Sequence, residues 1–251
     1  MPVFGELELG TIARELPQMR NLDTEAWELP KAEILQLACE IADGSRVLLP
    51  RALHPAIPDY VTFLVTRYPE SPVGPFDLAQ VRLMARAGVH PRGYVLSAVA
   101  STASAAAELR ERWGFPVVPG EIALRRYHDR VAASVRRDGA TILEMALIDP
   151  EIVSGSDLQY IHGVTLARVD GATQLIQIDP HYTLHRAARG RAHVSRFDAQ
   201  AWHARPVTLA MPISASTSTS DTDLPRIRFV MDPLKPVFQG TRRIRESRAD
   251  E

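Results

Sequence analysis

Lysine is scarce in this chain, and this limits the amine chemistry that the protein can perform. The 29 basic residues comprise only two lysines, Lys31 and Lys235, so the rest are arginines. Because arginine stays protonated in proteins, it cannot form an imine with a ketone at ordinary pH. Lys31 is open to three interpretations: a solvated residue, a cation that binds a substrate carboxylate, or an imine-forming amine. Lys235 lies between Pro233 and Pro236 near the C-terminus and is interpreted as a surface residue.

Tyr160 and His162 are candidates for acid–base catalysis. Both lie in the stretch LQYIHGV, which we predict to be a strand, and strand alternation then places them on one face. Histidine changes charge near neutral pH and suits proton transfer. The alternative for His162 is a purely structural role.

Further polar residues could contact a ligand. Arg82 and Met84 share a face of the strand predicted after VGPFD, and Asp77 lies in the preceding turn. Arg110 and Glu111 are adjacent in the stretch ELRERWGFP, and we favour a structural ion pair over a catalytic dyad.

Metal and nucleotide sites are not indicated. Asp179, His181 and His185 would share a face of one strand, but Pro180 interrupts it, so we predict no metal. The chain has no Gly-rich phosphate loop, Rossmann fingerprint or Gly-x-Ser-x-Gly elbow. We therefore expect no cofactor.

Composition restricts the class of protein. The chain has 251 residues, 45% of them hydrophobic, a net charge of −1 and a single cysteine, Cys39. The net charge disfavours nucleic-acid binding and the single cysteine excludes an intrachain disulfide. No apolar run approaches the ~20 residues that a membrane span needs. The first ten residues lack the pattern of a signal peptide. We expect a soluble, cytoplasmic protein that acts on a small molecule.

The residue pattern predicts one mainly β (α+β) domain over residues 1–251. Strands are predicted at 31–41, 60–68, 93–100, over most of 121–186 and near the C-terminus, and a helix at 102–113. Residues 1–30 are expected to form an N-terminal extension with a short helix within 21–30. The Ser/Thr-rich stretch 213–223 is expected to be a surface loop.

Four motifs occur in an order that resembles the acetoacetate decarboxylase superfamily: LLPRALHP, VGPFD, GYVLSAVAS and ELRERWGFP. The resemblance extends over nearly the whole chain from about residue 30. It implies a β-barrel or cone with a few flanking helices, and a homo-oligomer. It also implies catalysis by a lysine that forms a Schiff base with a keto acid.

This chain departs from the family at the positions that the resemblance assigns to catalysis. The Schiff-base lysine falls on Val117 and its neighbouring lysine on Val118. The two glutamates of the family fall near Phe63 and Leu78, and its substrate-binding arginine falls on Lys31. Arg110 and Glu111 are retained.

The function predicted from these departures is an enzyme without the Schiff-base lysine. We expect a cyclase, isomerase or lyase of specialised metabolism that acts on a keto- or polyketide-type substrate through pocket shape, acid–base groups or hydrogen bonds. The alternatives are a noncatalytic ligand-binding protein and a decarboxylase or aldolase that uses Lys31. Lys31, Tyr160 and His162 are the candidate catalytic residues. The candidate substrate-binding residues are Phe63, Asp77, Leu78, Arg82, Met84, Arg110, Glu111, Phe115, Val117 and Val118.

The four apolar replacements are expected to line one cavity. We predict that Val117 and Val118 face the same space as Phe63 and Leu78, together with Tyr160 and His162. A valine is smaller than a lysine, so this space should accept a ligand bulkier than acetoacetate.

Overall fold

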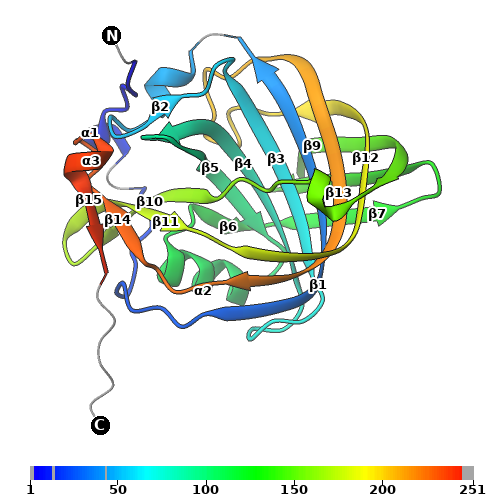
Figure 1. Cartoon of the computed structure of the whole chain (residues 1–251), viewed down its shortest axis with the longest axis horizontal. Helices are drawn as coiled ribbons and strands as arrows, with labels where there is room; N and C mark the ends of the chain where they lie inside the picture. Colours follow the sequence, from blue (N-terminus) through cyan, green and yellow to red (C-terminus); the bar gives the residue numbers. More distant parts are fainter. Residues whose placement is uncertain (1–2, 13–14, 43, 245–251) are drawn as a thin grey trace.

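A single curved sheet forms most of the molecule (Figure 1). The computed structural model describes residues 3–12, 15–42 and 44–244. The strands are β1 (Trp27–Ile41), β2 (His54–Pro55), β3 (Tyr60–Tyr68), β4 (Phe76–Ala87), β5 (His90–Ala100), β6 (Val117–Pro119), β7 (Glu121–Arg126), β8 (Arg130–Arg137), β9 (Ala140–Val153), β10 (Gly163–Val169), β11 (Ala172–Ile178), β12 (His181–Phe197), β13 (Leu209–Leu224), β14 (Phe229–Met231) and β15 (Thr241–Arg243). The α-helices are α1 (Leu9–Ile12), α2 (Ala103–Trp113) and α3 (Val237–Gly240).

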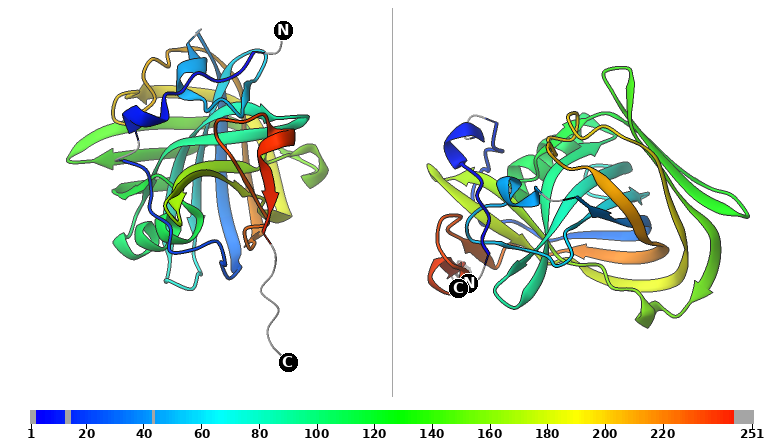
Figure 2. Two further views of the ribbon diagram at one scale, coloured as in Figure 1. Left: turned by 90° about the vertical axis from the view of Figure 1, so that its left-hand side faces the viewer. Right: turned by 90° about the horizontal axis from the view of Figure 1, so that it is seen from above.

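The strand order of the sheet is β15-β14-β11-β10-β5-β4-β3-β1-β13-β12-β9-β8-β7. Of these pairs only β10 and β5 are parallel, and β6 adds a short parallel pair beside β5. The end strands β7 and β15 do not pair with each other in the described chain, so the sheet is open although it curls strongly (Figure 2). The predicted mainly β fold with few helices is confirmed, but the sheet does not close into a barrel.

Several predicted elements occur close to their expected positions. The strands expected at 31–41, 60–68 and 93–100 are β1, β3 and β5, and the expected helix is α2. Helix α2 begins after Thr102, whose side chain accepts a hydrogen bond from the Ala105 amide at 3.2 Å. It ends at Gly114, which adopts the left-handed conformation with φ 64°.

Local structure differs from the prediction in two segments that belong to β1 and β13. The short helix expected within 21–30 is not formed, and β1 begins there at Trp27. Residues 213–223 are not a surface loop but most of β13, which lies between β1 and β12. The predicted N-terminal extension also contributes Met19, Trp27 and Leu29 to the buried core.

The central strands β1, β3 and β4 are covered on both faces. Odd-numbered residues of β3, such as Phe63, pack with β7, β8 and β9 in what we call the large core. Even-numbered residues such as Leu64 of β3 and Leu78 of β4 face the opposite way, toward α2, β10, β11 and the start of β12. We call this second face the cavity side, because it encloses the cavity described below.

The three α-helices are too short to cross a membrane; no helix among the described residues is long and apolar enough to do so.

Candidate functional site

A small enclosed cavity lies on the cavity side of the central strands. Its volume is about 30 Å³, enough for one or two water molecules. Residues distant in the sequence lie together here, because strands β1, β3, β4, β10, β11, β12 and β13 all contribute lining residues. The lining residues are Leu29, Leu64, Tyr68, Phe76, Leu78, Gln80, Arg82, Leu109, Phe115, Gly163, Ile178, Pro180, Tyr182, Thr222 and Leu224.

The guanidinium group of Arg82 is the only permanent charge among the lining residues, and it is only 6% exposed. Its Nε donates a hydrogen bond to Oε1 of Gln80 at 2.9 Å, and its Nη1 donates one to the carbonyl of Ile161 at 3.1 Å. Tyr182 lines the same cavity. No carboxylate pairs with Arg82 in the described part of the chain.

Burial lowers the pKa of Arg82, and the nearby phenol oxygens of Tyr182 and Tyr68 oppose this shift. Arginine nevertheless remains charged at physiological pH. A buried charge without a counter-ion is costly, because neutral hydrogen-bond partners replace only part of its hydration. An anionic ligand in the cavity would supply the missing charge, so the site is suited to bind a carboxylate.

The sequence of β4 places Arg82 in this position. Strand alternation directs Leu78, Gln80 and Arg82 to one face, and a β-bulge lies between Val81 and Arg82 where β4 pairs with β5. Across the pair, Gly93 leaves room for the arginine: a Cβ at this position would be 3.0 Å from Cδ of Arg82.

Proton transfer in the cavity is limited to phenols. The titratable lining residues other than Arg82 are Tyr68 and Tyr182. Burial raises the pKa of both phenols, so they are protonated near neutral pH. No lysine, histidine, cysteine or carboxylate lines the cavity, and the site as described therefore has donors but no base.

The predicted common cavity of the four apolar replacements is not formed. Val117 packs on the cavity side in the same apolar cluster as Leu78 and Phe115, although it is not itself a lining residue. Phe63 lies in the large core, where its ring meets that of Phe197 at 5.1 Å. Leu78 and Phe115 fill space beside Val117, so the missing lysine has not opened a larger pocket.

Val118 faces the large core, because neighbouring residues of a strand point to opposite faces. It lines a separate, wider pocket of about 470 Å³, to which Arg110 also contributes. The side chains of the adjacent valines therefore point into different parts of the molecule. This contradicts the prediction that both face one ligand.

The position of Lys31 does not suit the catalytic role that was predicted for it. Its side chain is 74% exposed and forms an ion pair with Glu70, with Nζ 2.9 Å from Oε1. This carboxylate raises the pKa of Lys31, which opposes its use as a neutral nucleophile. Lys235 is also exposed and pairs with Asp232 at 3.1 Å. Neither of the two lysines of the chain lines the cavity.

Tyr160 and His162 do not lie in a strand; β10 begins only at Gly163. The Tyr160 hydroxyl is 2.8 Å from Oγ of Ser218, so this phenol is paired within the protein. Burial raises the pKa of Tyr160 to about 12. Its ring packs at 5.1 Å from that of Tyr182, beside the cavity rather than in its lining.

His162 belongs to a cluster on the face opposite Arg82. Its Nδ1 lies 2.9 Å from Oδ1 of Asp179, and Nη1 of Arg92 lies 2.9 Å from the same oxygen. Arg92 precedes Gly93, whose Cβ would point at Arg82, so strand alternation directs Arg92 the other way. The backbone thus separates His162 from the cavity.

The remaining predicted residues have local structural partners. Asp77 pairs with Arg67 at 3.0 Å, and Met84 accepts a weak hydrogen bond from Thr62 at 3.5 Å. His185 pairs with Asp221, away from the partners of Asp179, so the histidines and aspartate weighed as metal ligands do not converge. No group of potential ligands suited to a metal occurs among the described residues.

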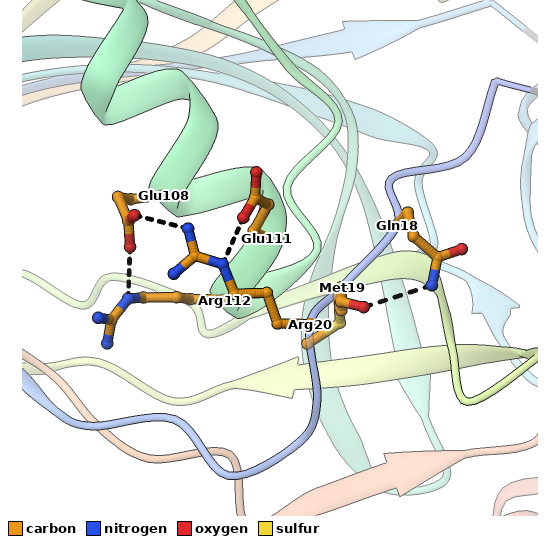
Figure 3. A network of polar contacts seen from close by, with 6 residues as sticks. All are labelled: Gln18, Met19, Arg20, Glu108, Glu111 and Arg112. Atoms are coloured by element: carbon orange, nitrogen blue, oxygen red, sulfur yellow. Dashed lines mark hydrogen bonds and ion pairs between the residues drawn. The ribbon is translucent and has the colours of Figure 1, made fainter.

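Glu111 does not pair with Arg110, contrary to the ion pair that we favoured. It contacts Arg20 of the N-terminal segment, in a network shown in Figure 3. Glu108 joins this network through Arg20 at 2.9 Å and Arg112 at 2.6 Å. The network attaches the N-terminal segment to α2.

Sequence reasoning missed the polar lining residues Tyr68, Gln80, Tyr182 and Thr222. The alternation in DLAQVRL could have indicated Gln80 beside Arg82. Burial alternates only at the end of β13, where Ser220 and Thr222 are buried between more exposed residues, whereas residues 215–218 are all buried. Its polar composition concealed this strand pattern, because hydroxyl side chains are more often found in loops.

Comparison with known proteins agrees with the architecture. Residues 19–234 match the family model described as "Acetoacetate decarboxylase (ADC)". No curated protein sequence matches the chain significantly.

Three solved structures illustrate the likeness in fold. An acetoacetate decarboxylase from Legionella pneumophila is 19% identical, with a TM-score of 0.73, covering 84% of this chain and 90% of its own. The enduracididine biosynthesis enzyme MppR, solved with pyruvate, is 14% identical, with a TM-score of 0.68 and coverage of 82% and 90%. An acetoacetate decarboxylase-like enzyme from Sphingomonas wittichii is 15% identical, with a TM-score of 0.57 and coverage of 80% and 91%.

Proposed function

Because the chain belongs to the acetoacetate decarboxylase family, we propose that it is an enzyme that binds a small organic acid through Arg82 and transforms it without an imine at position 117. The observation that carries this proposal is the buried guanidinium group beside a cavity, with no carboxylate partner in the described chain. The carboxylate of a substrate would pair with this charge and displace the water that the cavity can hold.

The positions of the lysines support a mechanism without an imine. Val117 stands where the family resemblance places the nucleophile, and both lysines of the chain lie on the surface in ion pairs. An imine at Lys31 would form outside the cavity, away from Arg82. This makes the decarboxylase or aldolase that uses Lys31 the weakest of the three alternatives.

The kind of reaction follows from what the cavity can provide. A guanidinium–carboxylate pair stabilises the ionised acid, which opposes loss of that carboxylate as carbon dioxide. We therefore propose a cyclase, isomerase or lyase that retains this carboxylate and acts on a small keto acid, because a cavity of about 30 Å³ has no room for a polyketide-type substrate. Specialised metabolism, a cytoplasmic location and a homo-oligomeric state remain predictions from sequence.

The alternative is a noncatalytic protein that binds such an acid in the same cavity. Fold alone does not decide between the two, because unrelated functions share scaffolds. Turnover of a candidate acid would separate them, whereas binding alone would fit both.

Calorimetric titration of small acids tests the proposal. Pyruvate is a suitable first probe, because one structural neighbour was solved with it, and acetoacetate is the second. We expect Arg82→Met to weaken binding at least tenfold, since a charged hydrogen bond contributes about 1.5–3 kcal/mol. Arg86→Met is the matched control, because Arg86 lies on the same strand but is exposed. Equal affinity in the wild type and Arg82→Met would overturn the proposal.

A further inference from the structure

The pocket of about 470 Å³ that Val118 lines, which we call the wide pocket, is large enough for a small-molecule ligand. Pockets that bind such ligands measure about 300–1,000 Å³. The wide pocket shares no lining residue with the cavity beside Arg82, so the two are separate spaces. Its apolar lining residues include Leu96 of β5, Val118 of β6, and Leu7, Ile12 and Leu16 of the N-terminal segment.

The N-terminal segment is attached to the rest of the protein at two points beside the wide pocket. The amide of Leu7 donates a hydrogen bond to the carbonyl of Leu49 at 2.9 Å. The carbonyl of Pro17 accepts one from the amide of Arg168 at 2.8 Å. Leu7 and Leu16 lie at these two points and both line the pocket, so backbone hydrogen bonds hold this part of its wall in place.

Arg110 brings an unpaired positive charge to the wide pocket. Its charged neighbours on α2 have partners, because Arg112 pairs with Glu108 at 2.6 Å and Glu111 pairs with Arg20. The half-buried side chain of Arg110 has no hydrogen bond or ion pair with any described residue. Its position in the last turn of a helix favours a cation. The guanidinium group is therefore available to an anion in the pocket.

Two hydroxyl groups also open onto the wide pocket. Tyr94 and Ser97 of β5 line it and are only 5% and 3% exposed. Neither hydroxyl has a hydrogen-bond partner in the described part of the chain. Both oxygens still reach open space, because neither is among the described polar side-chain atoms that are sealed from solvent without a hydrogen bond. A ligand with polar atoms would satisfy these groups, whose burial without partners is unfavourable.

The charges around the wide pocket indicate the charge of its ligand. Arg110 and the exposed Arg205 are cationic and Glu15 is anionic, so with His203 neutral the lining carries one net positive charge. A monoanion such as a carboxylate balances this charge, whereas a dianion would exceed it. Most of the lining residues are apolar, so the rest of the ligand should be apolar as well.

We propose that the wide pocket is a second binding site, which takes an amphipathic carboxylic acid. The carboxylate pairs with Arg110, and the apolar chain lies against Leu96, Val118 and the N-terminal segment. This inference does not depend on the proposed function, because no residue of the cavity beside Arg82 takes part. The wide pocket has room for larger acids that the smaller cavity cannot hold.

The experiment uses octanoate as the probe, because it combines one carboxylate with an apolar chain. 1-Octanol has the same chain without the charge, and acetate has the charge without the chain. Each is titrated by calorimetry into the wild type, Arg110→Met and Val118→Trp. Arg112→Met is the matched control, because Arg112 lies on the same helix but does not line the pocket.

We expect the wild type to bind octanoate and Arg110→Met to bind it about tenfold more weakly or worse, because a charged hydrogen bond is lost. Octanol binding should differ by less than about threefold between these two proteins, since octanol has no charge to pair. Val118→Trp should weaken binding of both about tenfold or more, because the larger side chain fills the pocket. Arg112→Met should bind octanoate as the wild type does, and acetate should not compete with octanoate. Circular dichroism confirms folding of each variant.

The outcomes distinguish this inference from the proposed function. Equal octanoate affinity in the wild type and Arg110→Met, or in the wild type and Val118→Trp, would overturn the inference, as would a wild type that binds no octanoate. Arg82→Met should bind octanoate normally. Loss of octanoate binding in Arg82→Met alone would place the acid in the other cavity and overturn the inference. A failure to bind pyruvate would overturn only the proposed function.

A second copy of the chain is the other possible occupant of the wide pocket. Gel filtration of the wild type and Val118→Trp over a range of protein concentrations tests it. We expect both proteins to elute at the same volume, with and without octanoate. An assembly that Val118→Trp disrupts, in a protein that does not bind octanoate, would assign the pocket to an interface and overturn the inference.

Discussion

Gly93 lies directly against the aliphatic part of Arg82, on the neighbouring strand. A Cβ at position 93 would be 3.0 Å from Cδ and 3.4 Å from Cβ of the arginine. The absence of a side chain here lets the guanidinium group reach the cavity, and two substitutions can test this relationship.

Gly93→Ala is expected to displace Arg82 and weaken pyruvate binding about tenfold, because the added methyl group leaves too little space for the arginine side chain. Gly163→Ala is the matched control. Its Cβ would lie 4.0 Å from Cζ of Arg82, which is ordinary van der Waals contact. Calorimetry should show near-normal binding by Gly163→Ala. Equal loss in both variants would show that binding depends on cavity volume rather than on the position of Arg82.

Val117→Lys is expected to destabilise the protein by about 3–5 kcal/mol, because it buries a charge without a partner in an apolar cluster. Val117 is 2% exposed. Val118→Lys is the control, since Val118 is half-buried at the edge of a wider pocket and a lysine there can reach water. Urea unfolding of the three proteins measures the difference. A Val117→Lys variant as stable as the wild type would mean that the site can accommodate the family's lysine.

Acetoacetate with borohydride is expected to leave no reduced adduct at position 117, and acetoacetate should not be decarboxylated. The reason is that valine has no amine and the two lysines lie on the surface. Mass spectrometry of the digested protein maps any adduct, and carbon dioxide release measures decarboxylation. An adduct at Lys31 that accompanies turnover would instead support the imine alternative.

Asp179→Asn is expected to lower the stability of the protein near neutral pH. It should also make the stability change less as the pH falls into the acid range. Burial alone would raise the pKa of Asp179, but the contact with His162 and the charge of Arg92 outweigh it and lower the pKa from 3.8. A pKa that is lower in the folded state contributes stability above pH about 4, which is lost as the pH falls through the folded-state pKa.

Melting temperatures between pH 7 and pH 3 test this linkage, with Asp138→Asn as the control because the Asp138 side chain is 87% exposed. We expect Asp138→Asn to follow the wild-type curve. If Asp179→Asn also follows that curve over the whole range, the cluster around His162 makes no net contribution to stability.

The sequence by itself determined most of the strands, helix α2 and the absence of a lysine at position 117. Strand alternation and the capping residues Thr102 and Gly114 are local properties, and they act over a few residues. The ordered motifs indicated the family, and Arg82 was already a candidate for ligand contact. These features depend on neighbours in the chain.

The tertiary structure decided which residues share the cavity. A shift of one residue along a strand moves a side chain to the other face of the sheet. Catalytic positions assigned from the family resemblance alone can therefore fall on the face away from the cavity. Phe63 and Val118 did so, whereas Leu78 lines the cavity and Val117 packs beside it.

Tyr182 and Thr222 line the same cavity as Arg82 only because β12 and β13 pair along the same sheet that contains β4. The polar stretch 213–223 becomes a buried strand because β1 and β12 flank it and satisfy its backbone hydrogen bonds. Long-range pairing of this kind has no local signal in the chain, and it determines the chemistry of the site.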